Sequence, residues 1–320
     1  MIALTLRKIL YVVLMLLLIS IISFGAIHLA PNSFFASGEL NPNITPESLE
    51  QLKKVYGLDK SLPMQFIAWF QAMLRLDFGI SFASGKAVRD EILSRLPITL
   101  LMNVVSMVLV FVLSLYFGIR SAMKRGSYDS AIKQFALISY AMPSFYLSLL
   151  LVMFLAVYWK IFPISGLHSV DVGTGLKYYL DMAWHLVLPI FVMVFGGVGS
   201  LILYVRSLTL NILKSDYIFF ARSRGVEGSA LLRHFILPNL SPPLITILGL
   251  SLPSLIGGSV ILESIFAING MGLLFYQSAL SRDYPVIMGI LIISSLLTLL
   301  GNMIADLVLS RLNPHFKRKN

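Results

Sequence analysis

The chain has 320 residues, of which 57% are hydrophobic and 12% are charged, and its formal net charge is +10. Soluble domains carry about a quarter charged residues, so this composition excludes an ordinary soluble domain and is typical of a membrane protein. The absence of cysteine excludes a disulfide framework, a thiolate metal site and a thiol nucleophile.

The first predicted element is a membrane span at Ile9–Leu29, which follows the basic start Met1–Lys8. Signal peptides also begin with a basic segment and an apolar run. This run is longer than their usual apolar region, and no Ala-x-Ala cleavage site follows it. We therefore expect residues 1–30 to form a retained first transmembrane helix.

Residues 31–97 form a long loop in which we expect short helices. Thr45-Pro46-Glu47 has the residue order of a helix start, and Gly57 is expected to end the helix Glu47–Val55. Pro63–Leu76 carries a helical stripe of apolar and aromatic side chains. Two interpretations fit this stripe equally well: a helix lying in the membrane interface, and a small cap packed on the bundle.

Five further apolar windows follow, and each is long enough to cross a bilayer, which takes about 20 helical residues. Backbone amides in lipid must be satisfied internally, and the alternating pattern of barrel strands is absent, so we expect helices. An all-α membrane protein with six transmembrane helices is predicted. The five windows are Ile98–Ile119, Phe135–Trp159, Leu186–Val205, Leu244–Leu262 and Val286–Leu309. Prolines in or beside these spans are expected to kink them, namely Pro143, Pro189, Pro253 and Pro285.

The distribution of basic residues predicts the orientation. With the N-terminus inside, the inner segments hold 15 of the 25 Lys and Arg residues and three of the 15 acidic residues. This asymmetry places both termini and the basic tail at residues 310–320 in the cytoplasm, and residues 31–97 outside. The net charge is therefore a sign of topology, and we expect no nucleic-acid partner. The inner segments are Met1–Lys8, Arg120–Lys133, Arg206–Leu240 and Ser310–Asn320.

The largest inner segment contains a polar insert, Ser215–Asn239, between two apolar windows. Gly225 permits a turn with positive φ between two short helices, and Pro238 is expected to end the second helix and begin the next span. Basic residues on such a knob fit either an acidic groove of a soluble partner or anionic lipid. From periodicity alone, an ordinary interfacial loop is the simpler interpretation.

Several stretches, in order and spacing, resemble the peptide and nickel branch of ABC-importer permeases. The pattern Ala221-x-x-x-Gly225 followed by Leu237-Pro238 resembles the EAA loop of that family, although Phe219 and Phe220 stand at its Glu-Ala positions. Asn32-Ser33-Phe34 also replaces the usual Gly-Asp-Pro. The other matching stretches are Leu76–Ser81, Arg95–Pro97, Met142–Phe145, Pro163–Gly166, Gly257–Phe266, Arg282–Val286, Asn302 with Asp306, and Leu312–Pro314.

The resemblance implies the type I importer permease fold in the cytoplasmic membrane, with a five-helix core at residues 98–309 that includes a coupling loop at residues 215–239. It implies four kinds of partner besides membrane lipid: a second homologous permease, two ATPase subunits and an extracytoplasmic solute-binding protein. The chain has no phosphate-cradling Gly-x-x-x-x-Gly-Lys-Ser/Thr loop, so it is not expected to be an enzyme. ATP and Mg are expected only on the partner ATPases.

The candidate functional residues fall into two groups. The resemblance implies an ATPase-docking role for Asp216, Tyr217, Ala221, Arg222, Arg224, Gly225, Glu227 and His234. Ionisable residues inside membranes are costly, which makes Glu263 and Asp306 candidates for a gate or path. Both are expected near the ends of their spans, where hydration is cheap and a structural role is the simpler interpretation. No metal site is expected, because the five histidines are scattered.

The predicted cargo is a dipeptide or oligopeptide, and nickel or a metal chelate is the alternative within the same branch. Two other classes remain open. A proton-coupled secondary transporter would use Glu263 and Asp306 as buried carboxylates near the midplane, but it would leave Ser215–Asn239 without a role. A non-transporting membrane scaffold is the third class.

Overall fold

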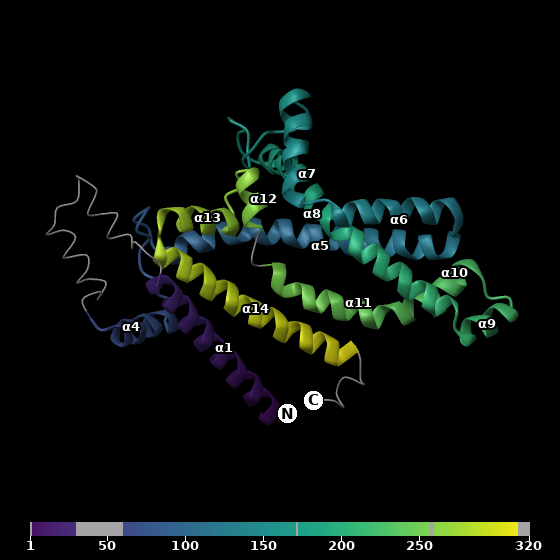
Figure 1. Ribbon diagram of the computed structural model, residues 1–320, viewed down its shortest axis with the longest axis horizontal. Coiled ribbons are helices and arrows are strands. Elements are labelled where there is room, and N and C mark those ends of the chain that lie inside the picture. Colours follow the sequence, from purple (N-terminus) through teal and green to yellow (C-terminus); the bar gives the residue numbers. More distant parts are fainter. Residues whose placement is uncertain (1, 30–59, 171, 256–258, 313–320) are drawn as a thin grey trace. The chain divides into compact units, whose positions relative to one another are not determined.

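A computed structural model describes residues 2–29, 60–170, 172–255 and 259–312. These residues are almost entirely helical, with one isolated β-bridge between Ile80 and Ala87 (Figure 1). The predicted helix Glu47–Val55 and the segment Asn32–Phe34 lie outside the described residues. The chain divides into two compact units, one of residues 1–97 with 270–300 and the other of residues 98–269 with 301–320.

The first unit contains α1 (Ile2–Leu29), α4 (Leu62–Leu74), the first turns of α5 (Val88–Lys124), α13 (Met271–Ser281) and most of α14 (Tyr284–Leu312). The predicted first span lies in α1. A buried apolar cluster joins these helices, because each contributes side chains that leave water on packing. Its buried members are Met73, Phe78, Val88, Ile92, Met271, Leu274, Val286, Ile290 and Ile292.

Helix α4 confirms the helix predicted at Pro63–Leu76. It begins after Ser61 with a proline in its first turn, where the missing N–H costs nothing. Trp69 and Phe70 pack against the buried cluster, whereas Met64 and Ile67 are exposed. Its apolar residues are therefore divided between packing within the unit and an exposed face.

Helix α5 contains the predicted second span but begins ten residues before it. Residues 88–97, assigned to the outer loop from the sequence, are thus already helical, and Pro97 lies inside the helix. Asp90 and Glu91 stand in the first turn, where acidic side chains stabilise the N-terminal end of a helix. Burial of Val88 and Ile92 fixes this polar extension to the first unit.

The predicted third span is two helices rather than one. Helix α6 (Gly126–Ala141) ends before Pro143, and α7 (Ser144–Leu151) continues into a π-helical segment, Val152–Tyr158, at an angle of 97° to α6. The kink predicted at Pro143 is confirmed. The ring of proline disfavours helical conformation in the residue before it, and Met142 is extended with ψ 119°.

Helix α8 (Leu176–Leu213) contains the predicted fourth span and lies beside α6 (Figure 1). Gly199 makes this approach possible, because a Cβ there would clash with the Ala136 carbonyl oxygen. The sequence analysis did not identify Gly199. Pro189 lies inside α8 without dividing it into two helices.

The bounds predicted for the fifth span, Leu244–Leu262, are wrong. Helix α11 (Leu237–Ser251) begins earlier, and a 3-10 turn at Leu252–Leu255 follows it. Glu263 belongs to a separate short helix, α12 (Val260–Ile265). Ser259 caps α12 by accepting a hydrogen bond from the Leu262 amide, so the apolar run contains a second helix start.

Helix α14 confirms the helix of the predicted sixth span, and Pro285 stands in its first turn rather than at a kink. Among the described residues, four helical segments are long and apolar enough to cross a membrane, or five if the bent α6–α7 pair is one span. They are Val88–Lys124, Leu176–Leu213, Gly228–Ser251 and Tyr284–Met303. The apolar part described in α1, Val13–Gly25, is shorter, so a count of six stays a prediction.

Candidate functional site

The insert between α8 and α11 folds as two short helices joined at a glycine, as the sequence predicts. Helix α9 (Asp216–Ser223) begins after the extended residue Ser215, and α10 (Gly228–Leu231) follows a short turn. Asp216 stands in the first turn of α9, where a carboxylate interacts favourably with the helix dipole. We call residues 215–239 the inner loop.

The turn after α9 depends on Gly225. Its φ of +81° lies in the left-handed region that residues with a Cβ resist. The Gly225 amide donates to the Arg222 carbonyl at 2.9 Å, and the Val226 amide donates to the Ala221 carbonyl at 3.1 Å. This pair of bonds is a Schellman motif, which satisfies the last carbonyls of a helix. The positive φ predicted for Gly225 is confirmed.

One face of the inner loop is buried against the ends of α5 and α8. Ile218, Ala221, Leu231 and Ile236 are all buried in one apolar cluster. This cluster also contains side chains from the two long helices, namely Ile119, Leu201 and Val205. Ala221 is therefore an anchor of the loop rather than an exposed contact residue. Because both short helices contribute buried side chains to this cluster, the whole loop packs against α5 and α8.

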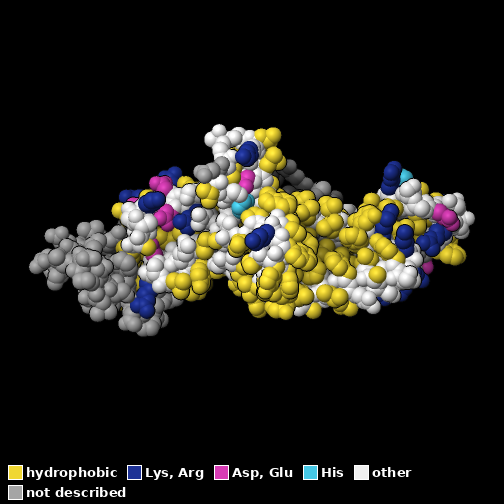
Figure 2. Space-filling model, turned by 90° about the horizontal axis from the view of Figure 1, so that it is seen from above, with side chains coloured by type: hydrophobic (Ala, Val, Ile, Leu, Met, Phe, Trp, Pro, Cys, Tyr) yellow, Lys and Arg dark blue, Asp and Glu magenta, His cyan; other side chains and the backbone are white. Residues whose placement is uncertain are grey.

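The opposite face of α9 is exposed and aromatic. Phe219 is 70% exposed and Phe220 is 63% exposed, and their rings are in edge-to-face contact with centroids 6.0 Å apart. Tyr217, Arg222 and Arg224 are also exposed. Figure 2 shows basic and acidic side chains gathered at the end that carries α9 and α10, beyond a broad hydrophobic surface. Two adjacent exposed phenylalanines are suited to an apolar recess in a partner.

Glu227 and His234 lie in the second half of the inner loop, and both are exposed. Glu227 precedes α10 in an extended conformation, and Gly228 has a φ of +56°. A ring nitrogen of His234 lies 3.0 Å from the Ala230 carbonyl oxygen, one helical turn earlier. All eight predicted docking residues thus lie in the inner loop. Ala221 and Gly225 determine its shape, and the other six have exposed side chains.

Pro238 does not end the second helix, so that prediction is wrong. Helix α10 continues through a π-helical segment, Leu232–Ile236, into α11. The wider π turn accommodates the proline ring, which would meet the carbonyl of residue 234 in an α-helix. Side chains then bond nearby carbonyls: Asn239 donates to Phe235, and Ser241 donates to Pro238, whose carbonyl Pro242 leaves without an amide donor.

A partly buried ion pair joins the helices from which the inner loop extends. Arg206 of α8 donates two hydrogen bonds to the Asp129 carboxylate of α6, at 2.6 and 2.7 Å. The Ser121 hydroxyl of α5 donates to Asp129 at 2.5 Å, and Lys133 lies 3.4 Å away. The sequence analysis used these residues only as signs of topology. The sequence did carry one sign of this ion pair: Asp129 is a single acidic residue within a basic segment between two apolar windows.

Glu263 is fully buried in the protein, at 1% exposure, rather than hydrated near a span end. The Thr99 hydroxyl of α5 donates to its carboxylate at 3.0 Å. The expectation of cheap hydration is therefore wrong, while partnership with neighbouring side chains agrees with a structural role. Asp306 lies in the helical backbone of α14, but its side chain is outside the described residues, so a path role stays a prediction.

The structure describes the side chains of three of the five histidines. His168 and His185 both lie near Asp181, at 3.4 and 3.6 Å from the same carboxylate oxygen. His234 belongs to the inner loop. Within the described ranges, no group of three or more acidic or histidine side chains has the arrangement needed to hold a metal ion.

Comparison with known proteins gives consistent matches along the chain. Residues 114–318 match the family described as binding-protein-dependent transport system inner membrane component, and residues 1–103 match the description of its N-terminal part. The oligopeptide transport system permease protein AppB of Bacillus subtilis is 37% identical over 97% of this chain and 98% of its own length.

Two further likenesses concern cargo and fold. The metal-staphylopine import system permease protein CntB of Staphylococcus aureus is 31% identical over 86% of this chain and 85% of its own length. A chain of the MetNI methionine ABC transporter, solved in inward facing conformations, superposes with a TM-score of 0.50. That match covers 69% of this chain and 96% of the other at 18% identity, so it shows likeness of fold alone.

Proposed function

The chain belongs to the binding-protein-dependent transport system inner membrane component family, and we propose that it is the permease subunit of an ATP-driven peptide importer. The inner loop carries this proposal. It is a compact knob with a buried anchor, a glycine-dependent turn and an exposed aromatic and basic face. Such a surface has the features of a docking site for a soluble subunit, and family membership makes that subunit an ATPase.

In this proposal, ATP and Mg bind to two partner ATPase subunits, and a homologous permease completes the path. A solute-binding protein delivers cargo to the outer segments of the membrane-embedded pair. Coupling requires the ATPase dimer to contact the inner loop differently in its closed and open states, because only differential contact shifts a conformational equilibrium. The proposed location is the cytoplasmic membrane, with both termini in the cytoplasm.

A peptide cargo is supported by the likeness to the oligopeptide permease over nearly the whole chain. The likeness to the metal-staphylopine permease supports metal chelates as the second candidate. The test is ATP-dependent uptake into vesicles by the full complex, purified through a tag on this chain. Uptake of labelled dialanine, but not of chelated nickel, is expected. Nickel uptake without peptide uptake would replace the proposed cargo, and uptake of either without ATP would contradict an ATP-driven importer.

Docking is tested separately by cross-linking. The chain has no natural cysteine, so single cysteines at positions 222 and 227 give unambiguous sites. Both are expected to cross-link to an ATPase subunit, while a cysteine at the exposed outer position 173 serves as the control. Cross-linking from position 173 but not from 222 or 227 would contradict both the docking site and the proposed orientation.

A further inference from the structure

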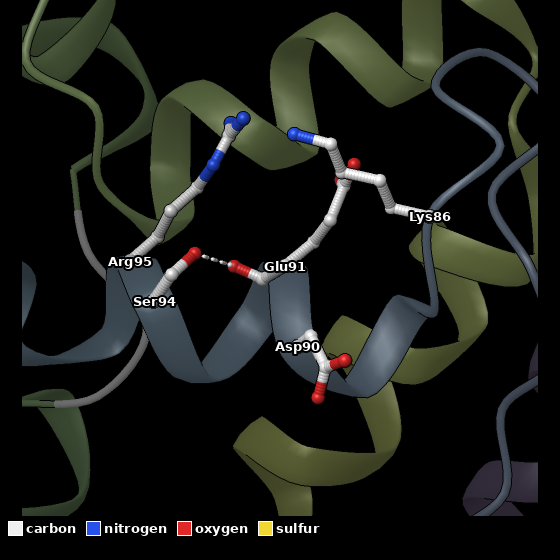
Figure 3. Close-up of a pocket in the computed structure, with 5 residues that line it drawn as sticks. All are labelled: Lys86, Asp90, Glu91, Ser94 and Arg95. Atoms are coloured by element: carbon white, nitrogen blue, oxygen red, sulfur yellow. Dashed lines mark hydrogen bonds between the residues drawn. The ribbon is translucent and has the colours of Figure 1, made fainter.

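A small pocket lies at the N-terminal end of α5, within the first compact unit. Its volume is about 260 Å³. In Figure 3 the Lys86 and Arg95 side chains extend to the same side of the helix, while Asp90 points away from them. The pocket is lined by Lys86, Asp90, Glu91, Ser94 and Arg95.

Arg95 is the unusual member of this set. Its Nη1 atom is buried and has no hydrogen-bond partner. A guanidinium stays charged at any physiological pH, and burying one of its N–H groups without an acceptor costs free energy. Among the described residues, neither Arg95 nor Lys86 forms an ion pair. Two cationic groups thus face one pocket, and one has a donor that lacks an acceptor.

The Glu91 carboxylate is held by the preceding turn instead of by these cations. It accepts a hydrogen bond from the Ser84 hydroxyl, which also accepts from the Lys86 amide at 3.2 Å. The Ser84 amide in turn donates to the Ser81 hydroxyl at 3.0 Å, and that hydroxyl donates to the buried Asp283 carboxylate. These bonds fix the position of Glu91 and leave Arg95 and Lys86 available to an external anion.

We propose that this pocket binds the two ends of a zwitterionic peptide, with Arg95 and Lys86 on the terminal carboxylate and Glu91 on the ammonium group. A guanidinium suits a carboxylate because its paired N–H groups match the two oxygens. The two lining carboxylates disfavour a doubly charged phosphate, whereas they favour a ligand that also carries a cation. In the predicted topology the pocket faces outward, where cargo arrives.

This inference rests on the proposed peptide cargo and names a site for it on the permease itself. The test measures binding of dialanine, its C-terminal amide and its N-acetyl form to the full complex without the solute-binding protein, by equilibrium dialysis. Unmodified dialanine is expected to bind roughly tenfold more tightly than the amide. Arg95→Gln is expected to abolish this preference, and Glu91→Gln is expected to abolish the preference over the N-acetyl form.

Two variants make the result specific. Arg89→Gln removes an exposed cation from the same helix outside the pocket and is expected to bind like the unaltered complex. Arg95→Lys keeps the charge and is expected to retain part of the preference for the carboxylate. The proposal is overturned if dialanine does not bind, or if Arg95→Gln still prefers the free carboxylate. Peptide uptake driven by the solute-binding protein would then still support the proposed function, so the two failures are distinguishable.

Discussion

Two turns in this molecule have the same hydrogen-bond pattern and different residues at the same critical position. After α9, Gly225 takes the left-handed conformation, and after α4, Leu76 takes it with a φ of +57°. In α4 the Leu76 amide donates to the Met73 carbonyl at 2.9 Å and the Asp77 amide donates to the Ala72 carbonyl at 3.0 Å, as in the motif after α9. The backbone geometry alone therefore does not require glycine.

What differs is how each turn is held to its surroundings. The chain after Leu76 is held by the buried Phe78 and also by polar bonds, because Asp283 accepts hydrogen bonds from the Ser81 hydroxyl and from the amides of Phe82 and Ala83. The chain after Gly225 is held by apolar packing of Val226 and Leu231. Specific hydrogen bonds can offset the conformational strain of Leu76. Apolar packing is non-directional, so the turn after α9 depends on a residue that adopts positive φ without strain, which is Gly225.

The largest expected effect comes from breaking the inner turn. Gly225→Val places a β-branched side chain in a left-handed conformation, at a cost of about 1–2 kcal/mol or more. No atom lies within 4 Å of the added Cβ, so the defect arises from the backbone and not from a clash. We expect normal membrane levels, lost uptake and weaker cross-linking from positions 222 and 227.

The matched control for this variant is Gly173→Val. Gly173 has a φ of +76° and equally open surroundings, but it lies in a predicted outer segment. It is expected to retain ATPase association and most of the uptake. Full uptake with unchanged cross-linking in Gly225→Val would exclude the inner loop as the docking site.

The next effect concerns the exposed aromatic face beside the inner turn. Replacing Phe219 and Phe220 together by serine is expected to weaken association with the ATPase roughly tenfold or more, since buried aromatic anchors dominate protein interfaces. Pull-down titration of the purified ATPase measures this. Tyr179→Ser removes an aromatic side chain that is 62% exposed on a predicted outer segment, and it should leave the affinity unchanged. Equal affinities for both variants would rule out aromatic docking.

A smaller effect is expected from weakening the hydrogen bonds that Asp283 accepts from the chain after Leu76. Asp283→Asn keeps the shape of the side chain but removes an acceptor oxygen, at a cost of about 1–3 kcal/mol in the free energy of unfolding. Thermal unfolding of the detergent-solubilised chain measures the loss. Asp77→Asn is the control, because exposed Asp77 accepts one hydrogen bond among the described residues, from the Gly79 amide at 3.0 Å. A larger loss in Asp77→Asn would contradict the assigned role of Asp283.

The smallest effect is expected from Leu76→Gly. Glycine relieves about 1–2 kcal/mol of left-handed strain, and its greater unfolded-state entropy cancels about 0.5–1 kcal/mol of that gain. A rise in the midpoint of thermal unfolding of a few degrees at most is expected, with unchanged uptake. A marked fall in stability would show that the exposed side chain of Leu76 itself stabilises the turn after α4.

The sequence predicted features that depend on a single residue and its neighbours. The turn at Gly225, the break at Pro143 and the start of α4 follow from backbone preferences, which act locally. The continuation of α10 past Pro238 was not predictable in this way, because it depends on a π-helical segment and on the side chains of Asn239 and Ser241.

Pairings between distant residues were also not predicted. Asp129 meets Arg206 across 77 positions, and Ser81 meets Asp283 across 202. Hydropathy also placed Glu263 at a hydrated span end, although folding buries it beside Thr99. A single sequence carries no direct signal of which polar groups meet, because many partners would satisfy the same hydrogen bonds. The stretches Leu76–Ser81 and Arg282–Val286, read separately as motifs, are joined at one site by Asp283.

The continuity of the helix through Pro238 has a mechanical consequence. Residues Gly228–Ser251 form one helical rod of 24 residues, which is about 36 Å long at 1.5 Å per residue. The N-terminal end of this helix is fixed by the buried side chains of the inner loop. Its C-terminal end reaches the 3-10 turn before α12. A tilt of about 10° at the loop end displaces the far end by about 6 Å. In the proposed importer, we expect the π-helical segment Leu232–Ile236 to determine how much of a displacement of the inner loop is transmitted along this helix and how much is lost as bending.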